Sequence, residues 1–307
     1  MFSTIEQIVR HAPVLPEMSI LIGSHAYPAS GGAKERQDRA LHALRALDGV
    51  ELVNLQFAQN WTPIILDGFE CLTILEHDSL TATGVKGIRK PLVGELCSTL
   101  AVEAHRRGSE YFCFTNSDIV FTQRAIDEMR DCRRDAYAFS RMEVDADSGA
   151  DEAINLQGVD AIATRPGWWL KNASRFRQFI VGETLWDQMY ASILLRHADA
   201  VLFNVHPLVR HVRHPIAWSE RGAFATYNGY LAALDSHYYS LWCEYHAARE
   251  EWARRGGSEE EHLAIQRSAF TRPWRPVTRL VQSLRRAKAW GRYRRFLLAC
   301  RRQTADE

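Results

Sequence analysis

The chain has 307 residues, of which 46% are hydrophobic and 24% charged, and its formal net charge is +1. This composition is that of an ordinary globular protein and excludes extensive disorder. The length suits one large α/β domain with additions. Charge is unevenly placed, because residues 272–302 contain eleven Lys/Arg and no Asp/Glu, whereas the rest of the chain has 27 basic and 37 acidic residues. An acidic body therefore carries a basic tail.

The cysteines and the lengths of the apolar runs indicate the cellular compartment of the protein. The six cysteines form no C-x-x-C pair, and several lie in apolar runs, where cysteine behaves as a small hydrophobe. This pattern argues against a disulfide framework or a zinc site and suits a reducing compartment. Glu6 and Arg10 interrupt the N-terminal apolar residues, and no apolar run reaches the length of a membrane span. We expect a cytoplasmic protein.

Strands and helices alternate in the first part of the chain. Prolines at positions 13 and 16 end a short predicted helix over residues 1–17. Strands are predicted at 19–23, 50–57, 71–75 and 111–115, and helices over 33–47 and from Lys90-Pro91 onward. Such alternation predicts an α/β fold with a mostly parallel sheet and helices on its faces.

The later elements are shorter and end in a helical region. We expect a helix capped by Thr122 over 122–132, strands at 136–142, 158–164 and 200–205, and a helix from about Glu183 to Arg196. Residues 143–151 are acidic and are expected to form an exposed loop. Beyond Gly222 the pattern is helical. We therefore divide the chain into residues 1–221, which hold the sheet, and a helical C-terminal extension over 222–307.

One stretch combines a buried strand with polar residues at its end. Tyr111-Phe112-Cys113-Phe114-Thr115 is apolar enough for a strand covered on both faces, and Asn116-Ser117-Asp118 follows it directly. Ligands of open α/β sheets bind at the carboxyl ends of strands, where a carboxylate can hold a divalent cation and the cation a phosphate. The alternative is that these three residues form only a turn and a helix cap.

Two further clusters could carry chemistry. Glu183 and Asp187 are four residues apart at a predicted helix start, where the helix dipole favours ionised carboxylates, so either could act as a general base. The alternative is that both only complement the dipole. His206, His211 and His214 lie within nine residues, and one of them could join Asp118 around a metal ion, although a single histidine is more often structural.

Basic and hydroxyl residues near the predicted strand ends form a more diffuse set. Ser24, Arg36 and Lys90 are its main members, and Arg39, Lys86 and Arg89 lie close to them in the sequence. Such groups match the charge and hydrogen-bonding needs of phosphates. The alternative for each is a solvated surface side chain. We expect Ser24, Arg36 and Lys90, together with Asn116, Ser117 and Asp118, to contact a phosphate-bearing ligand.

The order of these parts resembles the GT-A class of nucleotide-sugar-dependent glycosyltransferases over residues 18–216. The stretch ending in Asn116-Ser117-Asp118 is similar to the strand and D-x-D motif that hold a divalent metal and the donor diphosphate in that class. Glu183 through Asp187 resembles its acidic helix start, and His211 or His214 its late histidine ligand. The resemblance implies a Rossmann-like mixed sheet. The departure is Asn116, where an Asp is usual.

From the resemblance we expect a glycosyltransferase that uses Mn²⁺ or Mg²⁺, with Asp118, His211 and His214 as metal ligands. Its donor would be a nucleotide-sugar and its acceptor a glycan or lipid-linked molecule, in surface polysaccharide or lipopolysaccharide synthesis. Trp168 and Trp169 could offer a platform for a sugar, or lie in the core. Two alternatives stay open: a sugar-phosphate nucleotidyltransferase, partly matched by the glycine-rich residues 30–36, and a non-catalytic binding module of the same fold.

The basic tail has a helical pattern of its own. Apolar and aromatic residues recur at helical spacing between Val277 and Cys300, with Arg and Lys between them. A helix of this kind can lie on an anionic membrane surface, which would place the protein at the inner face of the membrane. It can equally pack on the acidic body. A nucleic-acid partner is not expected, because the body is acidic and no nucleic-acid-binding motif is present.

Overall fold

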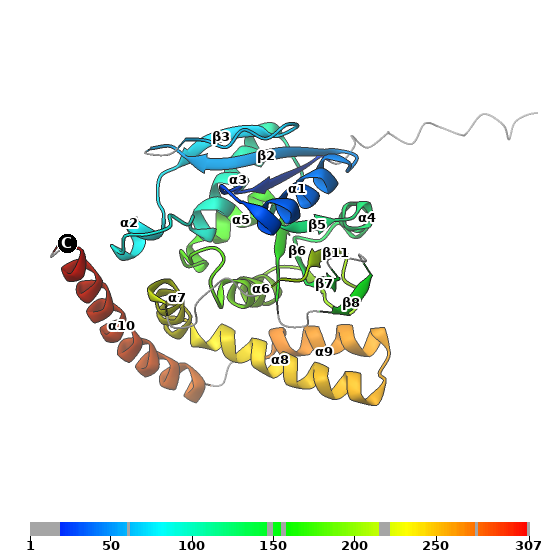
Figure 1. Ribbon diagram of the computed structural model, residues 1–307. Coiled ribbons are helices and arrows are strands. Elements are labelled where there is room, and N and C mark those ends of the chain that lie inside the picture. Colours follow the sequence, from blue (N-terminus) through cyan, green and yellow to red (C-terminus); the bar gives the residue numbers. More distant parts are fainter. Residues whose placement is uncertain are drawn as a thin grey trace, which may run out of the picture.

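A seven-stranded sheet organises the part of the chain that the computed structural model describes, namely residues 19–59, 62–145, 150–154, 158–214, 222–273 and 276–305 (Figure 1). The strand order is β10-β6-β9-β4-β1-β2-β3. The strands are β1 Ile20–Ser24, β2 Val50–Phe57, β3 Glu70–Leu75, β4 Tyr111–Thr115, β6 Ala136–Phe139, β9 Ala161–Thr164 and β10 Ala200–Phe203. Neighbours are parallel except around β9, which is antiparallel to β4 and β6. The predicted mixed, mostly parallel sheet is confirmed.

The central strands are buried on both faces, as their composition predicts. Every side chain of β1 and β4 is buried, and successive residues face opposite cores. Leu21 and Phe112 face one core, whereas Ile20 and Tyr111 face the other. Strands covered on both sides read as continuous apolar runs rather than as an alternating pattern.

Helices cover the two faces of this sheet (Figure 1). α1 (Gly31–Arg45) and α4 (Gln123–Cys132) pack on one core, and α3 (Val93–Arg107), α5 (Pro166–Asn172) and α6 (Trp186–His197) pack on the other. The short helix α2 (Ser79–Thr83) and a 3₁₀ turn over Ala173–Arg175 lie in connections. The expected helix over residues 1–17 lies outside the described residues.

A second, four-stranded sheet was not predicted. Its order is β5-β11-β7-β8, with β5 Ile119–Phe121, β7 Arg141–Val144, β8 Asp151–Ile154 and β11 Val209–Val212. The single strand expected at 136–142 is wrong, because the chain leaves the main sheet at Ser140 and β7 joins the second sheet. The exposed loop expected at 143–151 is also wrong at its ends, since Glu143 lies in β7 and Asp151 begins β8.

Two details near the predicted helix starts differ from expectation. Thr122 precedes α4 but does not cap it; its hydroxyl donates instead to the carbonyl of Leu208, at 2.7 Å. α6 begins at Trp186, so Glu183 lies before the helix rather than on a shared face with Asp187. The cause is local backbone, because Gly182 and Leu185 have φ of 70° and 77°, values incompatible with a right-handed helix.

The C-terminal extension is helical, as predicted: α7 Ala223–Leu234, α8 Ser236–Arg255, α9 Glu259–Thr271 and α10 Pro276–Ala305. Side chains of α7 and α8, such as Tyr227 and Trp242, share a core with Met189 of α6. The extension therefore shares a core with the first part of the chain, and the division into two parts at residues 221 and 222 stays a prediction. Across the described part of the chain, every helix is too short or too polar to span a bilayer.

Candidate metal and ligand site

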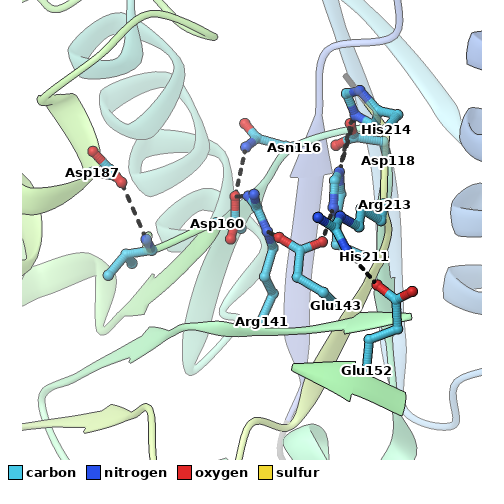
Figure 2. Close-up of polar contacts among 11 residues, drawn as sticks. Asn116, Asp118, Arg141, Glu143, Glu152, Asp160, Asp187, His211, Arg213 and His214 are labelled. Atoms are coloured by element: carbon cyan, nitrogen blue, oxygen red, sulfur yellow. Dashed lines mark hydrogen bonds and ion pairs between the residues drawn. The ribbon is translucent and has the colours of Figure 1, made fainter. Parts of the chain in front are cut away.

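A carboxylate and two imidazoles meet at the carboxyl end of β4. Asp118 follows β4, His211 lies on β11, and His214 follows β11 (Figure 2). The antiparallel pairing of His211 with Ile119 brings these segments together. The Asp118 Oδ2 atom lies 3.5 Å from His211 Nε2 and 3.6 Å from His214 Nε2, and the two Nε2 atoms are 3.2 Å apart. One ligand atom from each residue fits within 4.8 Å of the others, so the three could hold one metal ion.

Glu143 orients the first of these imidazoles. Its carboxylate lies 2.8 Å from Nδ1 of His211, and its other oxygen accepts from Arg141 at 2.7 Å. With the Nδ1 proton shared with Glu143, Nε2 of His211 is left to face Asp118. Burial lowers the pKa of His211, but hydrogen bonds to Asp118 and Glu143 outweigh it and raise the pKa to about 9. Burial raises the pKa of Asp118, and the two histidines bring it well below its ordinary value.

Next to the cluster, buried oxygens lack a hydrogen-bond partner. Asn116 follows β4, and its amide nitrogen lies 3.5 Å from Asp160 Oδ1, which also accepts from Arg141 at 2.6 Å (Figure 2). The Asn116 Oδ1 and Asp160 Oδ2 atoms are buried and have no partner. Unpaired buried polar atoms are uncommon, since each costs free energy. These two oxygens therefore have acceptor capacity that no group of the described protein uses.

Asp187 lies on the far side of Asp160 (Figure 2). It belongs to the first turn of α6, is partly exposed, and accepts from the backbone N–H of Val159 at 3.2 Å. Burial raises the pKa of Asp187 to about 6, and the charge of Asp160 adds to this effect. A carboxylate with this pKa is suited to accept a proton near neutral pH.

The loop after β1 borders the cluster. Ser24, the last residue of β1, is buried and its hydroxyl has no partner. Ser117 accepts a hydrogen bond from Gln37 of α1 at 3.2 Å. Tyr27 in this loop is partly exposed and is influenced by charges from two elements. Partial burial and the charge of Asp118 raise the pKa of Tyr27, and the charge of Arg36 lowers it. Ser24, Arg36 and Ser117 thus lie around one region, whereas their predicted ligand contacts stay predictions.

Glu183 and Lys90 form an ion pair with each other. Their Nζ and Oε1 atoms are 2.6 Å apart, and the Glu183 side chain is only 6% exposed. The sequence indicated separate roles, Glu183 as a base and Lys90 as a phosphate contact. In the structure each charge already has a partner 93 residues away.

The structure decides two alternatives that the sequence left open. His206 does not join the other histidines; its side chain is exposed and lies 3.9 Å from Glu259. Trp169 is fully buried in the core and cannot present a platform to a sugar. Trp168 lines a groove of about 480 Å³ with Glu110 and Asp135, residues that precede β4 and β6. That groove is at the opposite edge of the sheet from Asp118.

Sequence reasoning missed Arg141, Glu143 and Asp160. The signal available for Arg141 and Glu143 was a charged pair alternating with apolar residues, which indicates a strand as well as a loop. Asp160 interrupts an apolar run, GVDAIAT, and a carboxylate in such a run requires a partner. The identity of that partner depends on the second sheet, which the sequence did not predict.

No protein-family model and no curated protein matches the chain. Among solved structures, residues 1–349 of S. aureus TarS with UDP-GlcNAc give a TM-score of 0.46 at 10% identity over 92% of this chain and 81% of that one. The complex of the same protein with UDP gives 0.43 at 13% identity over 94% and 92%. A Desulfovibrio desulfuricans G20 protein described as a nucleotide-diphospho-sugar transferase gives 0.37 at 14% identity over 60% and 79%. With TM-scores below 0.5, these similarities transfer no property to this chain.

Proposed function

We propose that the protein is a glycosyltransferase that moves a sugar from a nucleoside-diphosphate donor to a hydroxyl group of an acceptor. The observation that supports this most is the Asp118–His211–His214 cluster, which lies at the carboxyl end of a central strand beside the loop after β1. Ligands of open α/β sheets bind at this edge. Asn116 and Asp160 lie beside the cluster, and each has a buried oxygen that no group of the described protein satisfies.

The donor set indicates which ion the cluster would hold. Imidazole nitrogens suit transition metals, whereas Mg²⁺ prefers oxygen ligands and retains several waters. Two imidazoles and one carboxylate therefore fit Mn²⁺ better than Mg²⁺. A divalent ion held by these three residues would offset the charge that develops on the leaving diphosphate. Glu143 would maintain the orientation of His211 in this complex.

For the proton of the acceptor we favour Asp187 over Glu183. The carboxylate of Glu183 is paired with Lys90, whereas Asp187 forms no ion pair among the described residues and burial raises its pKa to about 6. In the proposed step the acceptor O–H gives its proton to Asp187 and its oxygen bonds to the anomeric carbon. The bond from that carbon to the diphosphate breaks, and its electron pair stays on the diphosphate oxygen.

Charged and hydroxyl groups of the first half complete the proposed donor site. Arg36 on α1 would contact phosphate, and Ser24 and Ser117 would hydrogen-bond the nucleotide. Lys90 would act less directly, because Glu183 already balances its charge. The acceptor we propose is a glycan or lipid-linked molecule of surface polysaccharide or lipopolysaccharide synthesis in the cytoplasm.

The nucleotidyltransferase alternative is less well supported. It requires a flexible glycine-rich loop with free basic residues directly after the first strand. In the structure Gly31 already begins α1, and Lys34 forms an ion pair with Asp38 one helical turn later. The stretch over residues 30–36 is therefore mostly helix.

The test is thermal unfolding of the purified chain with UDP, GDP, CDP and dTDP, each with and without Mn²⁺. Binding stabilises the folded state by mass action, so at saturation we expect one diphosphate to raise the midpoint by about 5 °C in the presence of Mn²⁺. Asp118→Ala should abolish this shift, and the exposed control Asp127→Ala should retain it. If no nucleoside diphosphate shifts the wild type, the proposed function is wrong; a response confined to nucleoside triphosphates would favour the nucleotidyltransferase.

A further inference from the structure

Helix α10 presents a row of exposed side chains on the side away from the body. Leu284, Lys288, Arg295, Leu298 and Arg302 recur at spacings of three, four and seven residues, so they share one helix face. We call these five residues the outer stripe. All are exposed, with Leu284 at 66% and Leu298 at 54%. Exposed apolar side chains therefore alternate with basic ones along this face of the helix.

The opposite face of α10 holds the helix on the protein. Tyr293 packs on Tyr227 with ring centroids 5.8 Å apart, and Phe296 packs on Tyr230 at 5.4 Å. Cys300 is buried on the same face. In Figure 1 α10 lies beside α7 along one edge of the molecule. The contacts that fix α10 therefore do not involve the outer stripe.

Charge surrounds the outer stripe on both sides. Arg285 and Arg292 flank it on one side, and Arg294 and Arg301 flank it on the other, all of them exposed. Residues 272–302 contain no acidic side chain that could offset this charge within the segment. Trp290, which is 48% exposed, adds a side chain that favours the boundary between lipid and water.

We propose that the outer stripe of α10 lies on the surface of an anionic lipid bilayer, with Leu284 and Leu298 at the level of the headgroups and the surrounding arginines on lipid phosphates. The two leucines are 14 residues apart, or about 21 Å along the helix, with basic residues between them. That arrangement provides no continuous apolar seam for a second copy of the chain. Binding to nucleic acid would not explain the arrangement either, because contacts between arginines and phosphates do not need exposed leucines beside them. The helix is a surface anchor, independent of the donor chemistry.

The charge part is tested by co-sedimentation with vesicles of phosphatidylcholine alone or mixed with phosphatidylglycerol. Binding is expected only to the anionic vesicles and is expected to weaken from about 0.05 M to about 0.5 M salt. The variant R285E/R292E/R295E should lose binding at least about tenfold. Its matched control, R106E/R124E/R254E, changes the net charge equally at exposed positions elsewhere and should bind as the wild type does.

The apolar part is tested with L284S/L298S, which should weaken binding to anionic vesicles about threefold to tenfold. The control I65S/V102S removes apolar side chains that are 72% and 57% exposed, before β3 and on α3, and should leave binding unchanged. Equal losses in variant and control, equal binding to neutral vesicles, tighter binding to duplex DNA, or a dimer that L284S/L298S dissociates would each overturn the proposal. Nucleotide-induced thermal shifts should persist in every α10 variant, which separates failure here from failure of the proposed function.

Discussion

Asp118 and Glu183 are both carboxylates that face nitrogen groups from distant parts of the chain, yet their surroundings differ. Glu183 Oε1 lies 2.6 Å from Lys90 Nζ, and the Glu183 side chain is almost completely buried. Asp118 is 26% exposed and faces two imidazoles at 3.5 and 3.6 Å, groups that ligate metals when neutral. Glu183 is therefore held in a closed ion pair, whereas Asp118 lies among side chains that can each offer an atom to a metal ion once His211 gives up its extra proton.

The largest effect is expected at the proposed base. Asp187→Asn should lower the rate of sugar transfer by about 10²–10⁴-fold, because it removes the proton acceptor. Glu183→Gln should lower the rate less than about tenfold, since the amide still accepts a hydrogen bond from Lys90. Transfer rates under saturating donor measure both. If Glu183→Gln lowered the transfer rate more than Asp187→Asn, Glu183 rather than Asp187 would be the base.

A somewhat smaller effect is expected at Asp118. Asp118→Asn should lower transfer by about 10²–10³-fold, because the charge on the departing diphosphate is no longer offset. The exposed control Asp127→Asn should be unchanged. Transfer assays over a series of Mn²⁺ concentrations provide the measurement. Wild-type activity in Asp118→Asn would remove the cluster from the mechanism.

The groups around the histidines should tune metal affinity by a smaller factor. Glu143→Gln should weaken Mn²⁺ binding about 10–100-fold, because His211 loses the carboxylate that orients it. His206→Ala should not change it, since His206 lies beside Glu259 rather than in the cluster. Calorimetric titration with Mn²⁺ compares the two. Similar losses in both variants would mean that the effect is not specific to the cluster.

The smallest effect concerns stability and pH. The pKa of Asp187 is raised from 3.8 to about 6, so between these values the folded state binds more protons than the unfolded state. This group therefore stabilises less as pH rises from about 4 to about 6. Asp187→Asn cannot titrate and does not lose stability in this way, so above about pH 6 its free energy of unfolding should be the higher of the two. The difference should be no more than about 3 kcal/mol, because each pKa unit corresponds to about 1.4 kcal/mol. Urea unfolding of both proteins at about pH 4 and about pH 7 gives the comparison, and an equal slope with pH in the two would contradict it.

How far the sequence predicts this molecule depends on how each element is buried. β1 and β4 were predictable because strands covered on both faces read as apolar runs. The second sheet was not predictable, because its strands have only three or four residues each. The charged residues of β7 and β8 also give these segments a composition typical of a loop. In the site, Asp118 was predictable from its place after a strand. Glu143 and Asp160 were not predictable, because their roles depend on contacts with His211 and Arg141. Only the folded chain brings these residues together.

The central claim is that Asp118, His211 and His214 bind a divalent ion that in turn holds a nucleoside diphosphate. The most direct measurement is the electron paramagnetic resonance signal of free Mn²⁺ during titration with the protein, with and without the diphosphate selected by thermal unfolding. We predict one Mn²⁺ per chain, bound more tightly with the diphosphate, with binding lost in Asp118→Ala and retained in Asp127→Ala. Equal Mn²⁺ binding by Asp118→Ala and wild type, or no binding by wild type, would contradict the claim.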